Sequence, residues 1–548
     1  MIFKKHFPII VLILLSFIPL FDLVHPGLPI THDGQDHVAR IANFYQNLKE
    51  GNIIPRWAGN LNWGYGHPIL MFLYPLPSYV ASFFHFLGLS LIDSTKIVFG
   101  IAFLLSGLTM YLWIKNILGI HAGFIAAILY MYAPYRFVDL FVRGAIGEHV
   151  AFIFPPLICY FIYKLSKKYS HLFVVGGGLS VAGLLLSHNA ISFMFMPIFI
   201  FYVLYLLWQS DKKKLLVLSY LLVVGLGLGL SAFFWIPAFF EGKYTLRDIV
   251  TKGEYSSRYV RLEQFLYGPW IFGGTGQFSV QLGIVHWVII VGSAALLFFK
   301  KTAKEHKKFI VALLIIISFA LFLMISQSSI LWQNITLLQK FQFPWRLLSV
   351  VVFSTSVLGA LVVSAVPKNY KKYVVGIVIF MMLFFSKDYV HAKGFLYYKD
   401  DSFFSGIYNG TTDTGESSPI WSVRFMEKRP KERIEVISGE AFVKEISRES
   451  TVHIYEVDVT EKSRILENTL YFPGWNVFVN GKKAGVEFQD PKNRGLITFF
   501  LEKGDHIVSV RFKETKLRLA ANILSLLSLF FIVILGILNR AKLWQPSR

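Results

Sequence analysis

The chain has 548 residues, of which 55% are hydrophobic and only 16% are charged. Soluble domains usually carry about 25% charged residues, whereas the apolar residues here fall in runs of about 17 to 24, the length that a helix needs to cross a bilayer. The formal net charge of +21 does not indicate a nucleic-acid partner, because most of the lysines lie in short loops, where they orient membrane helices. The single cysteine, Cys159, excludes a disulfide framework and a cysteine-based metal site. The composition therefore predicts a polytopic helical membrane protein.

The first segment, MIFKKHFPIIVLILLSFIPLF, is basic and then apolar, like a signal peptide. No small-x-small cleavage site follows it, so we expect an uncleaved signal anchor with Lys4 and Lys5 in the cytoplasm. If each later basic cluster is also cytoplasmic, about twelve spans alternate across the bilayer and both termini lie in the cytoplasm. The basic clusters are 164–168, 212–214, 300–308, 367–372 and the C-terminal tail. The predicted spans after the anchor are 95–114, 119–136, 148–165, 171–187, 190–208, 215–238, 284–300, 309–326, 346–366, 373–390 and 517–538.

The segment 69–88, ILMFLYPLPSYVASFFHFLG, is apolar but does not fit this alternation. A single crossing there would reverse the orientation of the next span, and Pro75 and Pro77 interrupt helical hydrogen bonding. We therefore predict a re-entrant or membrane-surface element that protein or a cavity covers. The alternative is that this segment spans the membrane and a later one does not, and the charge pattern does not decide between the two.

The polar stretch 391–515 alternates like β-strands in WNVFV, AGVEF and HIVSVRF. Asn480-Gly481 lies between the first two of these runs and is a strong type I′ hairpin signal. Val508 and Val510 fall on one face of the third run, together with Phe512. We therefore predict a β-rich domain between membrane helices.

These patterns together predict an all-α polytopic membrane bundle with a β-sandwich-like domain before the last span. The bundle would have about twelve spans, and the β domain would lie outside the cytoplasm. The predicted boundaries are 1–390 for the membrane module with an external loop at 25–94, 391–515 for the β domain, and 516–548 for the final helix and cytoplasmic tail.

Many ionisable residues fall on the predicted outer side, several of them at or within apolar runs. A charge at membrane depth is costly unless it faces a cavity or a partner, so we expect these residues to meet in one polar cavity that faces away from the cytosol. The candidate catalytic carboxylates are Asp33, Asp36 and Glu148. The candidate substrate-binding residues are His37, Arg40, Arg56, His67, Arg143, His149, His188 and Arg346.

Each candidate also has a purely structural explanation, and these alternatives stay open. Asp33 and Asp36 could cap the helix that follows them. Arg143 could form a structural pair with Glu148, and Arg346 could extend its charge from the end of a span toward the membrane surface. Aromatic residues near the first loop could line a sugar site or form an interfacial belt, namely Trp57, Trp63 and Tyr65.

Carboxylates and guanidinium groups together suit the transfer of a sugar from a lipid-linked phosphate. A carboxylate can take the proton of the acceptor hydroxyl as its oxygen attacks the anomeric carbon. Arginine can stabilise the negative charge that grows on the leaving phosphate. A soluble nucleotide is not indicated, because GGTG at 273–276 lacks the Lys-Ser/Thr of a phosphate-binding loop.

The chain contains LKEGNIIPRWAGNLNWGYGHPILMFLYPLPSYV after a predicted external loop with aspartate, and then RGAIGEHVAFIFPPL, SHNAISFMF and FQFPWRLL. These stretches resemble bacterial polytopic proteins of the GT-C glycosyltransferase superfamily. The nearest group is that of 6-pyruvoyl-tetrahydropterin synthase-related membrane proteins, although nothing in the chain resembles a soluble pterin enzyme. The ending YFPGWNVFVNGKKAG…LEKGDHIVSVRF is similar to that of bacterial membrane proteins implicated in glycosylating cell-envelope polymers.

The resemblance implies an inverting transfer at the outer face of the plasma membrane. The donor would be a polyprenyl-phosphate sugar, and the acceptor a glycan, lipid or protein of the cell envelope. The resemblance maps an essential acid of the first external loop onto Asp33, with Asp36 as the alternative, and a second acid onto Glu148. Some members bind a divalent metal through paired acids, but here Glu148 is followed by His149, which argues against a metal, and no other cofactor is expected.

In the mechanism that we expect, Asp33 accepts the proton, and Arg143 and Arg346 hold the lipid phosphate. His37 and Arg40 lie one turn apart on one helix face and would orient Asp33 or bind the sugar. A transporter of lipid-linked sugars is one alternative, but it would have acids near mid-membrane and repeated halves, which the sequence lacks. A non-catalytic scaffold of an envelope-polysaccharide pathway is another, with the β domain as its working part.

Overall fold

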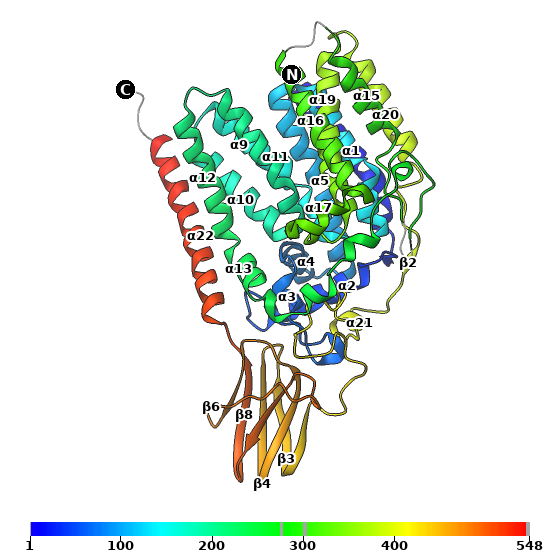
Figure 1. The fold of residues 1–548 in the computed structure, drawn as a ribbon. Coiled ribbons are helices and arrows are strands. Elements are labelled where there is room, and N and C mark those ends of the chain that lie inside the picture. The colour runs from blue at the N-terminus through cyan, green and yellow to red at the C-terminus, as the bar shows by residue number, and fades with distance from the viewer. Residues whose placement is uncertain (1, 274–277, 300–303, 544–548) are drawn as a thin grey trace.

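The computed structural model describes residues 2–273, 278–299 and 304–543, which form a helical bundle and a β-sheet (Figure 1). The sheet lies at one end of the bundle, and the start of the first helix, α1 (Ile2–Val24), and the end of the last, α22 (Lys516–Leu543), lie at the other. Parts of two predicted basic segments, 300–303 and 544–548, lie outside the described residues. The predicted β domain therefore lies at the opposite end of the molecule from the start of α1 and the end of α22.

Eight helices in the described residues are long and apolar enough to cross a membrane, or nine if one pair bent by 48° forms a single span. The bent pair joins α6 (Ile120–Met131) to the segment Pro134–Val142, which contains α7 (Pro134–Phe137) and the π-helix η2 (Val138–Val142). The others are α1 (Ile2–Val24), α5 (Leu91–Leu118), α8 (Ile146–Ala151) with α9 (Phe154–Lys167), α11 (Asn189–Trp208), α12 (Lys213–Leu230), α16 (Lys304–Met324), η7 (Pro344–Leu347) with α19 (Leu348–Ala365), and α22 (Lys516–Leu543).

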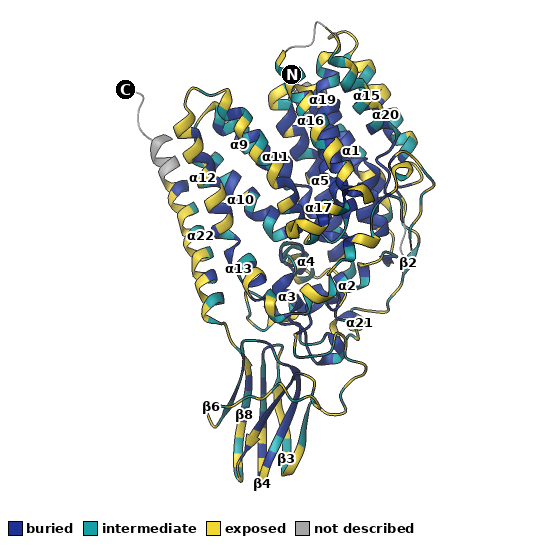
Figure 2. Cartoon of the chain, viewed as in Figure 1, coloured by how far each residue is buried: buried dark blue, intermediate teal, exposed yellow. Residues whose placement is uncertain are grey.

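Three further predicted spans correspond to shorter helices, α10 (His171–Ser187), α15 (Ile284–Leu296) and α20 (Lys371–Ser386). Each predicted span therefore contains a helix, but the count of twelve crossings is not confirmed and stays a prediction. Helix α19 lies inside the bundle, with 89% of its most apolar window buried, whereas the same fraction is 11% for α22 (Figure 2). The exposed side chains of α22 are largely leucine, isoleucine and phenylalanine, a surface that suits lipid better than water.

The segment 69–88 breaks into two short helices, α3 (Ile69–Phe72) and α4 (Leu76–Phe86). The chain is extended at Leu73, just before Pro75. Neither helix approaches the length of about 20 residues that a crossing needs, which agrees with the prediction that this segment does not cross once. Both helices lie at the end of the bundle that faces the sheet (Figure 1).

The sheet has six antiparallel strands in the order β3-β4-β8-β5-β6, with β7 also paired to β4. The predicted hairpin at Asn480-Gly481 is confirmed, because Val479 pairs with Lys482 and both turn residues have positive φ, +48° and +80°. The strands are β3 (Ile434–Arg448), β4 (Val452–Leu470), β5 (Trp475–Val479), β6 (Lys482–Ala484), β7 (Leu496–Leu501) and β8 (Gly504–Phe512).

The prediction of a sandwich needs correction, because the strands form one open sheet instead of two separate sheets. Strand β4 has 19 residues and pairs with β8 along its first half and with β7 along its second half, so hydrogen bonding is continuous. The register of β3 and β4 shifts near Ser438 and Glu440, and such bulges bend strands. The ring of His453 lies 2.9 Å from the carboxylate of Glu467, so the long hairpin folds back and its two halves face each other.

Residues 391–433, which precede the first strand of this sheet, run along the helical part of the molecule. Strand β2 (Phe395–Leu396) pairs with β1 (Leu28–Pro29). The short helix α21 (Ser402–Ser405) packs on α2 (Gly34–Lys49). The remaining short helices are α13 (Ala232–Phe240), α14 (Arg247–Val250), α17 (Ser329–Asn334) and α18 (Thr336–Gln339).

A joint of aromatic and charged side chains connects the sheet to the bundle. Trp57 is only 1% exposed, and its ring contacts that of Trp475 edge to face at 5.3 Å. Beside it, Arg56 donates to Glu514 at 2.7 Å. Trp57 therefore belongs neither to a sugar site nor to an interfacial belt, the two positions that its sequence context indicated.

Candidate functional site

The loop that carries Asp33 rests on the loop that carries Arg143. The backbone N–H of Asp33 donates to the carbonyl of Arg143, and that of the preceding residue donates to Val142, each at 2.9 Å. Gly144 has φ +68°, and a Cβ there would lie 2.4 Å from the hydroxyl of Thr31. Only glycine allows this close approach, so the motif RGAIGEHV keeps two distant parts of the chain in contact.

Arg143 is the centre of a buried charged cluster. Its Nη1 donates to Asp139 and to Glu148, at 2.8 Å in each case. The hydroxyl of Tyr135 also donates to Glu148, and Nε of Arg346 lies 3.5 Å from the same carboxylate. Both carboxylates are fully buried and would be strongly destabilising without such partners. The structure therefore contains the Arg143–Glu148 pair that the sequence indicated.

The backbone around this cluster is unusual. Asp139 lies in η2, a wider turn than an α-helix, and π-helical turns are frequent at functional sites. Further along, a Cβ at Gly147 would lie 2.1 Å from the ring of Tyr74 and 2.6 Å from the carbonyl of Ser187. Helix α8 can therefore approach these neighbours only because Gly147 has no side chain.

The guanidinium groups of Arg143 and Arg346 keep donors for a ligand. Within the described residues, Arg143 makes its side-chain hydrogen bonds through Nη1 alone. Among the described residues, Arg346 likewise makes its side-chain hydrogen bonds through Nη1, and its Nε lies 3.5 Å from the carboxylate of Glu148. A guanidinium has five N–H donors and no acceptor, so each group can still bind an oxygen of a phosphate or a carboxylate.

Asp33 has an exposed carboxylate without a protein partner. It occupies the N-cap position of α2, but its side chain makes no capping hydrogen bond. No other residue among those that the structure describes forms a hydrogen bond or an ion pair with this carboxylate. The capping explanation therefore does not hold for Asp33, and its carboxylate is free to accept a proton.

Asp36 has different surroundings. Its carboxylate accepts a hydrogen bond from the hydroxyl of Tyr408 at 3.0 Å and does not cap the helix. Burial raises the pKa of Asp36, and the nearby Arg40 guanidinium opposes this rise only in part. Asp36 is thus the more tightly held of the two aspartates and the less accessible to a substrate.

His37 and Arg40 lie one turn apart on α2 and bind each other, with Arg40 Nη1 2.9 Å from His37 Nδ1. Burial, together with the charge of Arg40, holds the pKa of His37 well below its usual range. The ring is therefore neutral at neutral pH. Arg40 also donates to the hydroxyl and carbonyl of Thr412. Among the described contacts, neither residue binds the Asp33 carboxylate, so they do not orient it directly, and binding of the sugar by these two residues stays a prediction.

Arg56 and His149 do not join the cluster. Arg56 donates to Glu514 at 2.7 Å and to Asn522 at 2.8 Å, in the joint with the sheet. The ring of His149 stacks on Phe103 at 6.2 Å, deep in the bundle. Both residues were expected to meet the other candidates in one cavity, and they do not, because residues on the same side of a membrane can still lie in separate places. Substrate binding by either residue is not tested and stays a prediction.

His67 and His188 lie closer to the candidate site. His67 Nε2 is 3.1 Å from the hydroxyl of Ser418. The ring of His188 stacks at 5.2 Å on Tyr74, the residue that also faces Gly147. Both histidines are buried, and Nδ1 of His67 has no hydrogen-bond partner among the described residues.

The sequence reasoning missed the segment 405–418, here named the crossing segment. Its residues were assigned to the β domain, yet they contact α2, the 60–63 loop and the chain before α19. The only local signal is its composition, YNGTTDTGESS, in which turn-forming residues predominate. That composition indicates a loop instead of strands but does not indicate where the loop lies.

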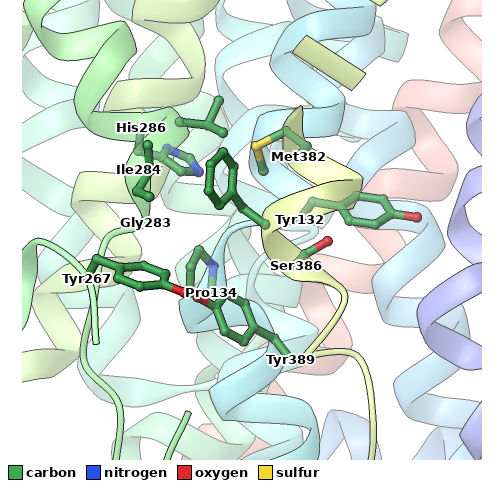
Figure 3. Close-up of a pocket in the computed structure, with 11 residues that line it drawn as sticks. Tyr132, Pro134, Tyr267, Gly283, Ile284, His286, Met382, Ser386 and Tyr389 are labelled. Atoms are coloured by element: carbon green, nitrogen blue, oxygen red, sulfur yellow. The ribbon is translucent and has the colours of Figure 1, made fainter. Parts of the chain in front are cut away.

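Two cavities lie beside other parts of the bundle. One is lined by residues that include Pro134, His286, Met382 and Tyr389 (Figure 3). Pro134 is also the residue before Tyr135 of the charged cluster. The residues that line the second cavity include Arg56. Asp33 and Glu148 line neither of these two cavities.

The described residues contain no group of three or more histidine, cysteine, aspartate or glutamate side chains arranged to hold a metal ion. The two acids that come together, Asp139 and Glu148, bind Arg143 between them. A guanidinium already occupies the position that a cation would take, so these residues do not fit a metal. Metal dependence itself stays a prediction.

Comparisons with known proteins relate the chain to membrane proteins. A protein of Lactococcus lactis subsp. cremoris (strain MG1363), described as uncharacterized, is 25% identical over 250 residues, which are 43% of this chain and 40% of the relative. The chain thus spans less than half of that relative. Two cryo-EM structures of the arabinofuranosyltransferase AftD from Mycobacteria, one of them a mutant, match 71% of this chain. They share 13% and 12% sequence identity, cover 27% and 28% of AftD, and have TM-scores of 0.44 and 0.41.

The model of one protein family matches residues 70–391, which are more than half of the chain. That family is described as "6-pyruvoyl-tetrahydropterin synthase related domain; membrane protein". The match includes the motif around Arg143 and Glu148 as well as Arg346, whereas Asp33 and the crossing segment lie outside it. The chain therefore belongs to the family of 6-pyruvoyl-tetrahydropterin synthase related membrane proteins.

Proposed function

We propose that this protein is an integral membrane glycosyltransferase. It transfers a sugar from a polyprenyl-phosphate donor to a glycan, lipid or protein acceptor of the cell envelope. The observation that carries the proposal is the contact between two loops. One loop holds the free carboxylate of Asp33, and the other holds Arg143, which has unused N–H donors.

Asp33 is the general base of the proposed reaction. The acceptor hydroxyl gives its proton to the Asp33 carboxylate while its oxygen forms a bond to the anomeric carbon. The bond between that carbon and the phosphate oxygen breaks at the same time, and its electron pair leaves with the phosphate. Attack from the face opposite the phosphate inverts the anomeric centre.

Arg143 and Arg346 bind the phosphate in this proposal. Both approach Glu148, which neutralises part of their charge and fixes their positions. Their remaining N–H groups can donate charge-assisted hydrogen bonds to the phosphate, whose negative charge grows in the transition state. The shared carboxylate of Glu148 is therefore a positioning group and does not itself touch the reacting atoms.

The proposal places the site on the outer face of the plasma membrane. Helices α2, α3 and α4 lie at the end of the bundle that carries the sheet, and the start of α1 and the end of α22 lie at the other end (Figure 1). Cytoplasmic termini would then put the sheet and the candidate site outside, where acceptors of the cell envelope are available.

The replacement Asp33→Asn tests the general base. Purified full-length protein in lipid nanodiscs would receive undecaprenyl-phosphate sugars and envelope extracts, and transfer of radiolabelled sugar would be measured. We expect Asp33→Asn to lower transfer by about 10²- to 10⁴-fold, the usual contribution of general-base catalysis, without lowering the amount of folded protein.

Asp211→Asn is the matched control, because Asp211 is exposed in a loop between α11 and α12 and should not affect transfer. Normal transfer by Asp33→Asn would exclude Asp33 as the base. If the wild-type protein carries out no transfer but moves labelled lipid-linked sugar across the bilayer, a transporter would replace the proposed enzyme.

A further inference from the structure

The crossing segment, residues 405–418, contacts the candidate site at four places. The segment makes these contacts through the Tyr408 hydroxyl with Asp36, the Thr412 carbonyl with Arg40, the Glu416 carboxylate with Gln342, and the Ser418 hydroxyl with His67. One segment thus reaches both α2 and the chain that precedes α19, so it connects the Asp33 side of the site to the Arg346 side.

Gln342 connects the crossing segment to Arg346. Its Nε2 donates to Glu416 at 2.9 Å, and its Oε1 accepts from Nη1 of Arg346 at 3.2 Å. An ionised carboxylate only accepts hydrogen bonds and a guanidinium only donates them. The amide of Gln342 therefore fits in one orientation alone, and Glu416 determines which end of it faces Arg346.

The backbone of this region is strained where it holds the arginines. Gln342 has φ +59° and Thr412 has φ +64°, values that residues other than glycine rarely adopt. Such strain persists only where the surroundings hold it, and it clusters at functional sites. Gln342 holds Arg346 and Thr412 holds Arg40, so each of these two strained residues binds a guanidinium group of the site.

We propose that Gln342 and Glu416 are positioning residues for Arg346. Through Gln342, the carboxylate of Glu416 fixes the guanidinium, while Glu148 approaches Nε from the other side. Arg346 Nη2 then stays available for the phosphate of the lipid-linked donor. The identity of that ligand rests on the proposed function, whereas the positioning of Arg346 does not.

Two replacements of Gln342 separate positioning from simple stability. Gln342→Met keeps the length of the side chain and the backbone strain but removes both hydrogen bonds. Gln342→Gly also removes them and relieves the strain, because glycine adopts positive φ freely. We expect Gln342→Gly to unfold at a higher temperature than Gln342→Met. Both variants should nevertheless make the Arg346 guanidinium equally mobile, because both lack the hydrogen bond from Arg346 to residue 342.

The first measurement needs no substrate. Full-length protein in nanodiscs would react with phenylglyoxal, and mass spectrometry would give the rate of modification at Arg346. Both Gln342 variants should raise this rate about tenfold, the change expected for the loss of one hydrogen bond to a charged group. Glu263→Gln, a change at an exposed residue, should leave the rate unchanged. An unchanged rate in both variants, or a rate that follows the unfolding temperature, would overturn the proposal.

The second measurement links positioning to catalysis. In the transfer assay, kcat/KM for the donor should fall about tenfold in both variants. A double variant that also carries Glu416→Ala should be no worse than either Gln342 variant, because the two residues act through one chain of hydrogen bonds. Additive losses of kcat/KM would contradict the proposal that Glu416 acts on Arg346 through Gln342. If phenylglyoxal reacts as expected but the wild type transfers no sugar, the positioning of Arg346 stands and the proposed function fails.

Discussion

Asp33 and Asp36 lie three residues apart, yet the structure gives them different chemistry. Asp33 is exposed and, among the described residues, unpaired, whereas Asp36 is partly buried and accepts a hydrogen bond from Tyr408. A base must reach its substrate before its pKa matters. Accessibility therefore favours Asp33, and the sequence alone could not make this distinction because both residues lie at the start of the same helix.

Asp36→Asn should stabilise the protein at neutral pH. Burial raises the pKa of Asp36 in the folded state, so ionising this carboxyl opposes folding. The penalty is absent at pH values below the pKa of the unfolded chain, and it grows as the pH rises through the folded pKa. Asparagine keeps an acceptor for Tyr408 without the charge.

Thermal unfolding in detergent, measured at pH 4 and pH 8, checks this prediction. The variant should gain stability over the wild type at pH 8 and gain less at pH 4. A loss of stability at pH 8 would mean that the ionised carboxylate supports the fold, contrary to its burial.

At the scale of elements, short-range patterns were predictable and long-range packing was not. The Asn480-Gly481 hairpin follows from two adjacent residues, and the Arg143–Glu148 pair lies within one motif. The fold-back of β3 and β4 and the path of the crossing segment depend on contacts between distant residues. Sequence patterns do not encode those contacts, which is why a two-sheet sandwich was expected and Glu416 was overlooked.

Glu467 is the polar centre of the folded-back hairpin. It is fully buried, and it accepts hydrogen bonds from Arg448, His453, Tyr455 and Thr469. Burial alone would raise its pKa, but His453 and Arg448 outweigh burial and lower the pKa to about 2. The ionised group therefore adds stability above the unfolded pKa of about 4.3, and this stability is lost as the pH falls toward 2.

Glu467→Gln should accordingly destabilise the sheet. The replacement leaves Arg448 without its buried counter-charge, a loss that costs about 3–5 kcal/mol where a buried pair is broken. Proteolysis of the sheet and urea unfolding followed by tryptophan fluorescence would measure the change. The matched exposed replacement Glu456→Gln should have little effect. Equal stability of the two variants would contradict a structural role for the Glu467 cluster.

At the scale of the whole molecule, the sheet is anchored to the bundle and is not a loosely tethered lid. Arg56 binds Glu514, and Arg518 at the start of α22 binds Glu241 at the end of α13. The ring of Trp57 packs edge to face against that of Trp475 and also contacts that of Phe512. Ion pairs and aromatic packing thus connect the segment 25–94, the sheet and the last helix.

Arg56→Ala tests this organisation, because Arg56 was expected to bind substrate and lies in the joint instead. We expect faster proteolysis between sheet and bundle and a lower unfolding temperature. The loss leaves Glu514 and Asn522 without a donor, at a cost of about 1–3 kcal/mol. KM for the lipid-linked donor should stay unchanged. A raised KM together with normal stability would show that Arg56 binds the donor and does not serve mainly to hold the sheet to the bundle.

We propose that Asp33, Arg143 and Arg346 line one binding site for a lipid-linked phosphate. A cryo-EM structure of the wild-type protein in nanodiscs with undecaprenyl phosphate would test this arrangement. We expect phosphate oxygens about 2.7–2.9 Å from guanidinium nitrogens of Arg143 and Arg346, with the Asp33 carboxylate facing the same space. A phosphate bound at another face of the bundle, or no bound lipid at saturating concentration, would contradict it.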